Sequence, residues 1–257
     1  MRLLAIDTST RAMGLALYSF DEKSPEGPLR GTFDGVSIER EGANPSDELF
    51  PLLEDLGERI DLDLRKKGTI NAYAVALGPG SFTGLRIGVT TAKTLAQFTQ
   101  SPLVGISTLR AMAWGWGRED LLHVPLIDAR ANRIYAAAYA CFKGKNEYLG
   151  EEPKVLIPGD LYYEEDLLPR VERAVQDQGL QGILYIGQGL SAHPALEKTS
   201  LAFEIAQGEN ADSPVRGLAI LAAQRLARGE SDSFLDLAPL YLRKSQAEMD
   251  RDRYERP

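Results

Sequence analysis

The stretch that decides the fold is Gly78-Pro79-Gly80-Ser81-Phe82-Thr83-Gly84-Leu85-Arg86-Ile87-Gly88. An apolar run over 73–77 precedes it and predicts a buried strand, and the apolar spacing after it predicts a helix over 85–98. Three glycines and a proline within seven residues indicate a turn of specific shape. A strand, a turn of small residues and a helix N-terminus together form the general arrangement that binds phosphate.

Strands and helices alternate on both sides of this turn. Strands are predicted over 2–6, 13–19, 31–39, 72–77 and 102–106, then over 123–128, 133–142, 154–157 and 183–186. Helices are predicted from a cap at Asn44, where Pro51 should bend the helix early or shift its start, and over 85–98, 109–116, 160–177 and 214–228. The pattern predicts an α/β protein with mixed β-sheets, built from two halves that each open with a strand ending in Asp and a hairpin.

These halves predict the domain organisation. We expect an N-terminal lobe over 1–108, completed by the helix at 214–228, and a smaller second lobe over 109–210. The charged C-terminal tail over 243–257 should be mobile unless a partner orders it.

Composition excludes several classes of function. The net charge of −8, from 37 acidic and 29 basic residues, argues against binding nucleic acid by general electrostatics. No apolar run reaches the roughly 18 residues of a membrane span, and Asp7 would interrupt a signal-peptide core. The single cysteine, Cys141, fits a reducing compartment and a packing role, so a cytoplasmic location is expected.

Metal binding and nucleophilic catalysis lack their usual motifs. His123 and His193 are far apart in sequence and are expected at ordinary surface or edge positions. The chain has no HxxxH, HExxH, CxxC or GxSxG pattern, so we predict neither a metal site nor a catalytic residue.

A phosphate-type loop is the clearest candidate site. The first strand ends in an acid and hydroxyls, which could hold a phosphate or magnesium or could simply satisfy a turn. The glycine-rich turn lacks the lysine of a P-loop. Arg86 is a cation in the first turn of the predicted helix, where the helix dipole disfavours it, so we expect it to contact a ligand, an acidic partner or a surface ion-pair partner. The candidate residues are Asp7, Thr8, Ser9, Gly78, Gly80, Ser81, Thr83, Gly84, Arg86 and Asp128.

The second hairpin, Asp128-Ala129-Arg130-Ala131-Asn132-Arg133, argues that this loop is vestigial. A nucleotide phosphate between two hairpins needs close backbone approach and therefore glycine, which this turn lacks. Its two arginines could bind an acidic partner or form local salt bridges. We therefore expect no tightly bound cofactor, with weak nucleotide binding left open.

A stripe of small residues marks the helix after the turn. Gly88, Ala92 and Ala96 lie at i, i+4 spacing, so another helix can approach closely, either within the chain's own core or from a partner. The predicted partner or dimer interface consists of Leu49, Leu53, Leu56, Leu85, Gly88, Val89, Ala92, Leu95 and Ala96.

Several motifs together resemble the bacterial TsaB (YeaZ) family over nearly the whole chain. The most specific is the stretch 78–88, and the supporting ones are Leu3-Leu4-Ala5-Ile6-Asp7-Thr8-Ser9-Thr10, Ile127-Asp128-Ala129-Arg130, Ile134-Tyr135 and Pro239-Leu240-Tyr241-Leu242-Arg243. One departure is Pro45-Ser46-Asp47, where many relatives have His-Ser-Glu.

This resemblance implies a two-lobed actin-like fold of the sugar-kinase and heat-shock ATPase superfamily. It implies an accessory, non-catalytic subunit in the formation of N6-threonylcarbamoyladenosine at position 37 of tRNAs that read codons beginning with A. The implied partners are the transferase TsaD and the ATPase TsaE, with a homodimer through the same early helices as the alternative and tRNA reached only through the complex. The TsaD relative carries a metal-binding HxxxH that this chain lacks.

A competing hypothesis is an ATP-dependent small-molecule kinase or ATPase of the same superfamily. In that case Asp7, the turn at 78–84 and Asp128 would hold the nucleotide phosphates.

Overall fold

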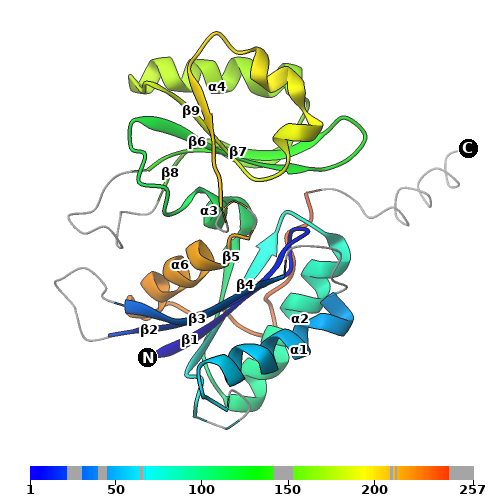
Figure 1. Cartoon of the computed structure of the whole chain (residues 1–257), viewed down its shortest axis with the longest axis vertical. Helices are drawn as coiled ribbons and strands as arrows, with labels where there is room; N and C mark the ends of the chain where they lie inside the picture. Colours follow the sequence, from blue (N-terminus) through cyan, green and yellow to red (C-terminus); the bar gives the residue numbers. More distant parts are fainter. Residues whose placement is uncertain are drawn as a thin grey trace, which may run out of the picture.

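The computed structural model describes residues 1–21, 31–39, 45–63, 66, 68–141, 153–208, 211 and 213–242. The predicted helix cap at Asn44 and the tail at 243–257 lie outside the described residues. Two five-stranded sheets lie one above the other, with helices packed on their faces (Figure 1). The prediction of an α/β protein with mixed sheets is confirmed.

The first sheet has the strand order β3-β2-β1-β4-β5. Its strands are β1 (Arg2–Asp7), β2 (Met13–Phe20), β3 (Gly31–Glu39), β4 (Ala72–Gly78) and β5 (Leu103–Ser107). β1, β2 and β3 pair antiparallel, whereas β4 and β5 run parallel to β1. The carboxyl ends of β1 and β4 therefore lie at the same edge of the sheet, and both motifs of the candidate loop follow these ends.

Helices cover both faces of the first sheet. Side chains alternate along a strand, so Leu4 and Ile6 of β1 pack with α1 (Pro45–Arg59) and α2 (Phe82–Thr99). Leu3 and Ala5 point the other way and pack against α6 (Val215–Ala227), which comes from the far end of the chain.

The second sheet repeats this connectivity, with the order β10-β9-β6-β7-β8. Its strands are β6 (Leu121–Asp128), β7 (Ile134–Ala140), β8 (Lys154–Tyr162), β9 (Gly182–Ile186) and β10 (Phe203–Ile205). One face is covered by α4 (Glu164–Gln178) together with η1 (Leu190–Ala192) and η2 (Pro194–Lys198). The other face receives α3 (Thr108–Ala113), which also contacts α6 and so lies where the two halves meet (Figure 1).

Several predicted boundaries move for local reasons. α2 begins at Phe82 rather than 85 because the Ser81 hydroxyl accepts a hydrogen bond from the Gly84 amide and caps the helix. Pro51 neither delays nor ends α1, which runs through it. β8 continues to Tyr162, so α4 begins at Glu164 instead of near 160.

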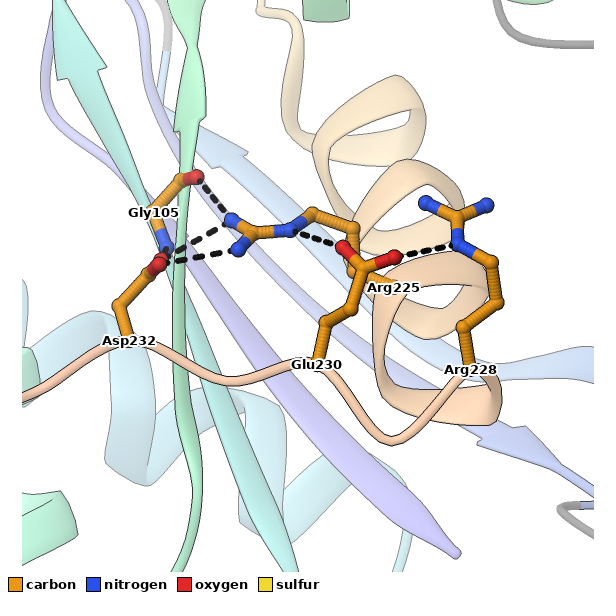
Figure 2. A network of polar contacts seen from close by, with 5 residues as sticks. All are labelled: Gly105, Arg225, Arg228, Glu230 and Asp232. Atoms are coloured by element: carbon orange, nitrogen blue, oxygen red, sulfur yellow. Dashed lines mark hydrogen bonds and ion pairs between the residues drawn. The ribbon is translucent and has the colours of Figure 1, made fainter.

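A segment after α6, residues 228–242, runs along the edge of the first sheet; we call it the strap. Asp232 forms an antiparallel bridge with Leu103 and accepts a hydrogen bond from the Gly105 amide at 2.7 Å. Figure 2 shows Arg225 of α6 bound to both carboxylate oxygens of Asp232 and to the Gly105 carbonyl, while Glu230 bridges Arg225 and Arg228. The strap therefore covers the edge strand β5, whose backbone would otherwise be open to pairing.

None of the described helices is long and apolar enough to cross a membrane.

Candidate functional site

Asp7, at the end of β1, is a fully buried carboxylate with only neutral partners. Its Oδ1 accepts hydrogen bonds from the Ser9 amide at 3.0 Å and the Ser9 hydroxyl at 2.5 Å. Its Oδ2 accepts one from the Ser213 hydroxyl at 3.1 Å, just before α6. Burial disfavours the charged form more than these bonds favour it, and the pKa of Asp7 rises to about 6.

The glycine-rich turn packs directly against the end of β1. A Cβ atom at Gly80 would lie closer than 3.0 Å to the Ser9 carbonyl oxygen. One at Gly84 would meet the Thr8 carbonyl in the same way, and one at Gly88 would meet the Thr8 hydroxyl. These glycines are therefore explained by close approach of the chain's own backbone.

The polar groups of the turn also have internal partners. The Ser81 amide donates to the Ser9 carbonyl at 2.7 Å, and the Gly84 amide donates to the Ser81 hydroxyl at 3.2 Å. The Thr8 hydroxyl donates to the Gly84 carbonyl at 2.7 Å. The residues at 7–9 and 78–84 thus come together, and the polar groups named here bond to one another within the chain.

Arg86 has aromatic partners. Its guanidinium stacks 4.0 Å from the centroid of the Phe82 ring, and its Nε donates to the Tyr241 hydroxyl at 3.1 Å. The Leu240 amide, in the same part of the strap, donates to the Leu77 carbonyl at 2.7 Å. Among the described residues no carboxylate pairs with Arg86, so the surface ion pair, one of the three explanations considered, is not found, and Phe82 and the strap residue Tyr241 contact the side chain.

The predicted interface residues require a correction. Seven of the nine are buried inside the protein, and only Leu53 and Leu95 are partly exposed. The buried residues are Leu49, Leu56, Leu85, Gly88, Val89, Ala92 and Ala96. Five of them belong to one core cluster, whereas Leu85 lies beside Gly78 and Gly88 lies beside Thr8. The small-residue stripe fits α2 against its own sheet, so it is not an exposed contact surface.

The outward sides of the same helices carry apolar residues that the sequence analysis did not select. Phe50 of α1 is 56% exposed and Phe98 of α2 is 74% exposed. Leu235 and Tyr241 of the strap are also exposed, and part of the strap borders an open groove along α2. One feature of the sequence could have indicated this surface. Phe98 does not share the i, i+4 spacing of Gly88, Ala92 and Ala96, so it lies off the small-residue stripe.

Asp128 lies at the corresponding end of β6 in the second sheet. Its Oδ1 accepts a hydrogen bond from the Arg130 amide at 2.8 Å, and the same atom lies 3.5 Å from His193 Nε2. Asp128 therefore takes part in a separate cluster within the second half.

Both histidines are buried, which corrects the expectation of surface or edge positions. The His123 ring contacts two backbone carbonyls, Ala113 at 2.9 Å and Arg118 at 2.8 Å, and burial lowers its pKa more than these contacts raise it. Cys141 donates a weak hydrogen bond to the same Ala113 carbonyl, and burial raises its pKa to about 12, so the thiol stays protonated at neutral pH. No group of three or more metal-ligating side chains occurs within the described ranges.

Comparison with known proteins agrees with this architecture. The TsaD family model, described as tRNA N6-adenosine threonylcarbamoyltransferase, matches residues 32–250. Two curated proteins named tRNA threonylcarbamoyladenosine biosynthesis protein TsaB are similar over 96% of both chains, with 31% identity for Escherichia coli (strain K12) and 30% for Bacillus subtilis (strain 168). The solved structure of YeaZ from Pseudomonas aeruginosa is 25% identical, with a TM-score of 0.68, and the match covers 94% of this chain and 99% of that one.

The two repeated sheets and these matches define a two-lobed α/β protein related to the TsaD transferases. Within that group, the relatives that match along their full length are TsaB proteins. The chain belongs to the TsaB (YeaZ) family.

Proposed function

We propose that this protein is an accessory, non-catalytic subunit in the formation of N6-threonylcarbamoyladenosine at position 37 of tRNA. Its partners in this proposal are the transferase TsaD and the ATPase TsaE. Membership of the TsaB family supports the pathway. The acidic net charge supports contact with tRNA through the complex, since the chain alone would repel a polyanion. A cytoplasmic location follows from the same role.

The packing of the glycine-rich turn carries the non-catalytic part of the proposal. In a working ATP site, backbone amides of such a turn would face the phosphates. Here the Ser81 and Gly84 amides donate to groups of the chain itself, and the Thr8 and Ser9 carbonyls lie against Gly84 and Gly80. These amides already have partners within the chain, which supports a scaffold over an ATP-dependent enzyme.

We infer that the partner binds the outward sides of α1 and α2. Phe50 and Phe98 are exposed there, and exposed aromatic residues are typical anchors of protein interfaces. The same outward sides would serve a homodimer, so the two assemblies would compete for one surface.

Reconstitution with cognate TsaD and TsaE tests the function. We expect tRNA modification with all components present and none with this chain alone, given tRNA and the threonylcarbamoyl-adenylate donor. Robust transfer by the isolated chain would contradict the accessory role. Tight binding of Mg-ATP in calorimetry, lost on Asp7→Ala, would instead support the ATP-dependent alternative.

The variant Phe98→Glu tests the surface. We expect it to fold normally, since the side chain is mostly exposed, and to lose co-purification with TsaD. Val155→Glu is the matched control, because Val155 is also an exposed apolar residue but lies on β8 of the second sheet. Equal capture of TsaD by both variants would refute the assignment.

A further inference from the structure

The open groove between α2 and the strap has two walls of different chemistry. The α2 wall is mostly polar, and its polar residues are Arg86, Thr90, Lys93, Thr94 and Gln97. The strap wall lies within residues 234–241 and is largely apolar, with Leu235 exposed to 78%. A polar wall that faces an apolar wall suits a segment with one polar side and one apolar side.

Contacts within the chain hold the groove in shape. The Lys93 Nζ atom donates a hydrogen bond to the Leu237 carbonyl at 2.9 Å, which ties the middle of α2 to the strap. Phe234 and Leu237 pack against the core cluster beneath α2. Nearer the start of α2, the Arg86 Nε atom donates to the Tyr241 hydroxyl. The groove is therefore already formed without a partner, which lowers the entropy cost of binding one.

The groove carries positive charge, although the net charge of the chain is −8. Arg86 and Lys93 line it, and no carboxylate is among its lining residues. Within the described ranges, neither of these side chains pairs with a carboxylate. Arg86 is exposed and uses only Nε for Tyr241, while the Phe82 ring orients its guanidinium. Its two outer nitrogens are thus placed to bind a carboxylate from outside.

The spacing of the two cations suits a helix. Arg86 and Lys93 are seven residues apart in α2, which is about two helical turns or about 10 Å along the axis. Thr90, between them, is small and exposed, so a second helix can lie along this side of α2.

We propose that the groove binds an acidic amphipathic helix of a partner protein. Two carboxylates seven residues apart on that helix bind Arg86 and Lys93, and its apolar side chains pack against the strap wall. The inference rests on the proposed function, in which this chain works together with other proteins.

A second copy of this chain and RNA fit the groove less well. In a second copy the acidic helix would be α1, which the structure describes throughout, and Phe50 is the only large apolar residue of α1 that is exposed. The strap wall, by contrast, offers apolar contacts over residues 234–241. RNA binding depends on neutralising many phosphates, and this groove has two cations.

Photo-cross-linking of the full chain in the reconstituted complex with TsaD and TsaE tests the proposal. A photoreactive phenylalanine analogue is placed at position 235, and mass spectrometry identifies what it captures. We expect a helical segment of another protein with two carboxylates seven residues apart. Capture of a second copy, of tRNA or of a segment without these carboxylates, or no capture at all, would overturn the proposal. Modification of tRNA in the same mixture reports separately on the proposed function.

A matched pair of variants at one position tests the role of charge. Thr90 is exposed between the two cations, and Thr90→Glu and Thr90→Lys both introduce a long side chain that favours helix. We expect Thr90→Glu to lower the yield of the cross-linked partner about tenfold, because it repels the incoming carboxylates, and Thr90→Lys to preserve it. Equal yields from the two variants, whether high or low, would overturn the proposal.

Discussion

Replacing Asp7 with asparagine should change how the stability of this protein depends on pH. The side chain is fully buried, and burial raises its pKa from 3.8 to about 6. The folded chain therefore holds this proton more tightly than the unfolded chain. The contribution of protonated Asp7 to the free energy of unfolding is fully present below pH 3.8 and is lost as the pH rises through 6.

The size of the effect follows from the shift. Each pKa unit corresponds to about 1.36 kcal/mol, so ionising Asp7 costs the folded state about 3 kcal/mol at neutral pH. Asparagine is neutral at every pH and has nearly the same shape. Its carbonyl oxygen can accept the two bonds from Ser9, and its amide can donate to Ser213.

Urea unfolding of both chains at several pH values between 4 and 8 measures this difference. The free energy of unfolding of Asp7→Asn minus that of the original chain should rise by about 2.5 kcal/mol from pH 4 to pH 7.5, since a small part of the effect is already present at pH 4. Any fixed cost of the asparagine shifts all points equally and leaves this rise unchanged. Asp236→Asn, at an exposed position of the strap, is the control and should give a much flatter difference. A flat difference for Asp7→Asn would refute the reasoning.

Three further substitutions test the packing. Gly84→Ala should destabilise the chain by roughly 1–3 kcal/mol in urea unfolding, because the new Cβ overlaps the Thr8 carbonyl; an unchanged midpoint would show that the contact is looser. Ala92→Arg buries an unpaired charge in the core and should cost on the order of 3 kcal/mol or more, seen as loss of soluble folded protein. A folded variant that had lost only partner binding would restore the interface interpretation. Asp232→Ala removes the hydrogen-bond acceptor of Arg225 and should lower the free energy of unfolding by about 2 kcal/mol. Amide hydrogen exchange along β5 should become faster. Unchanged exchange there would refute the role of the strap.

The sequence predicted the fold well because most elements are defined by local patterns. Alternating apolar residues gave the strands, and the change to helical spacing after Gly84 gave α2 within a few residues. The capping role of Ser81 explains the remaining difference, since its hydroxyl starts the helix three residues earlier than the apolar pattern does.

The candidate site was predicted only in part, because its meaning depends on contacts between distant residues. The glycines were recognised, but Thr8, which lies against Gly84 and Gly88, is some 76 residues away from the first of them. In the sequence, a stripe of small residues has the same spacing whether it packs against the chain's own sheet or against a partner protein. His193 gave no signal, since its partners Asp128 and Glu164 are far away in sequence.

The position of α6 has a consequence for the order in which this chain folds during synthesis. The second sheet consists of strands from Leu121 to Ile205, so all of it leaves the ribosome before α6 does. The first sheet, although made earlier, waits for α6 to cover Leu3 and Ala5 and for Asp232 to close its edge. The half that begins the chain is therefore completed last. Until then its uncovered face and open edge are the part of the nascent protein most exposed to aggregation and to chaperones.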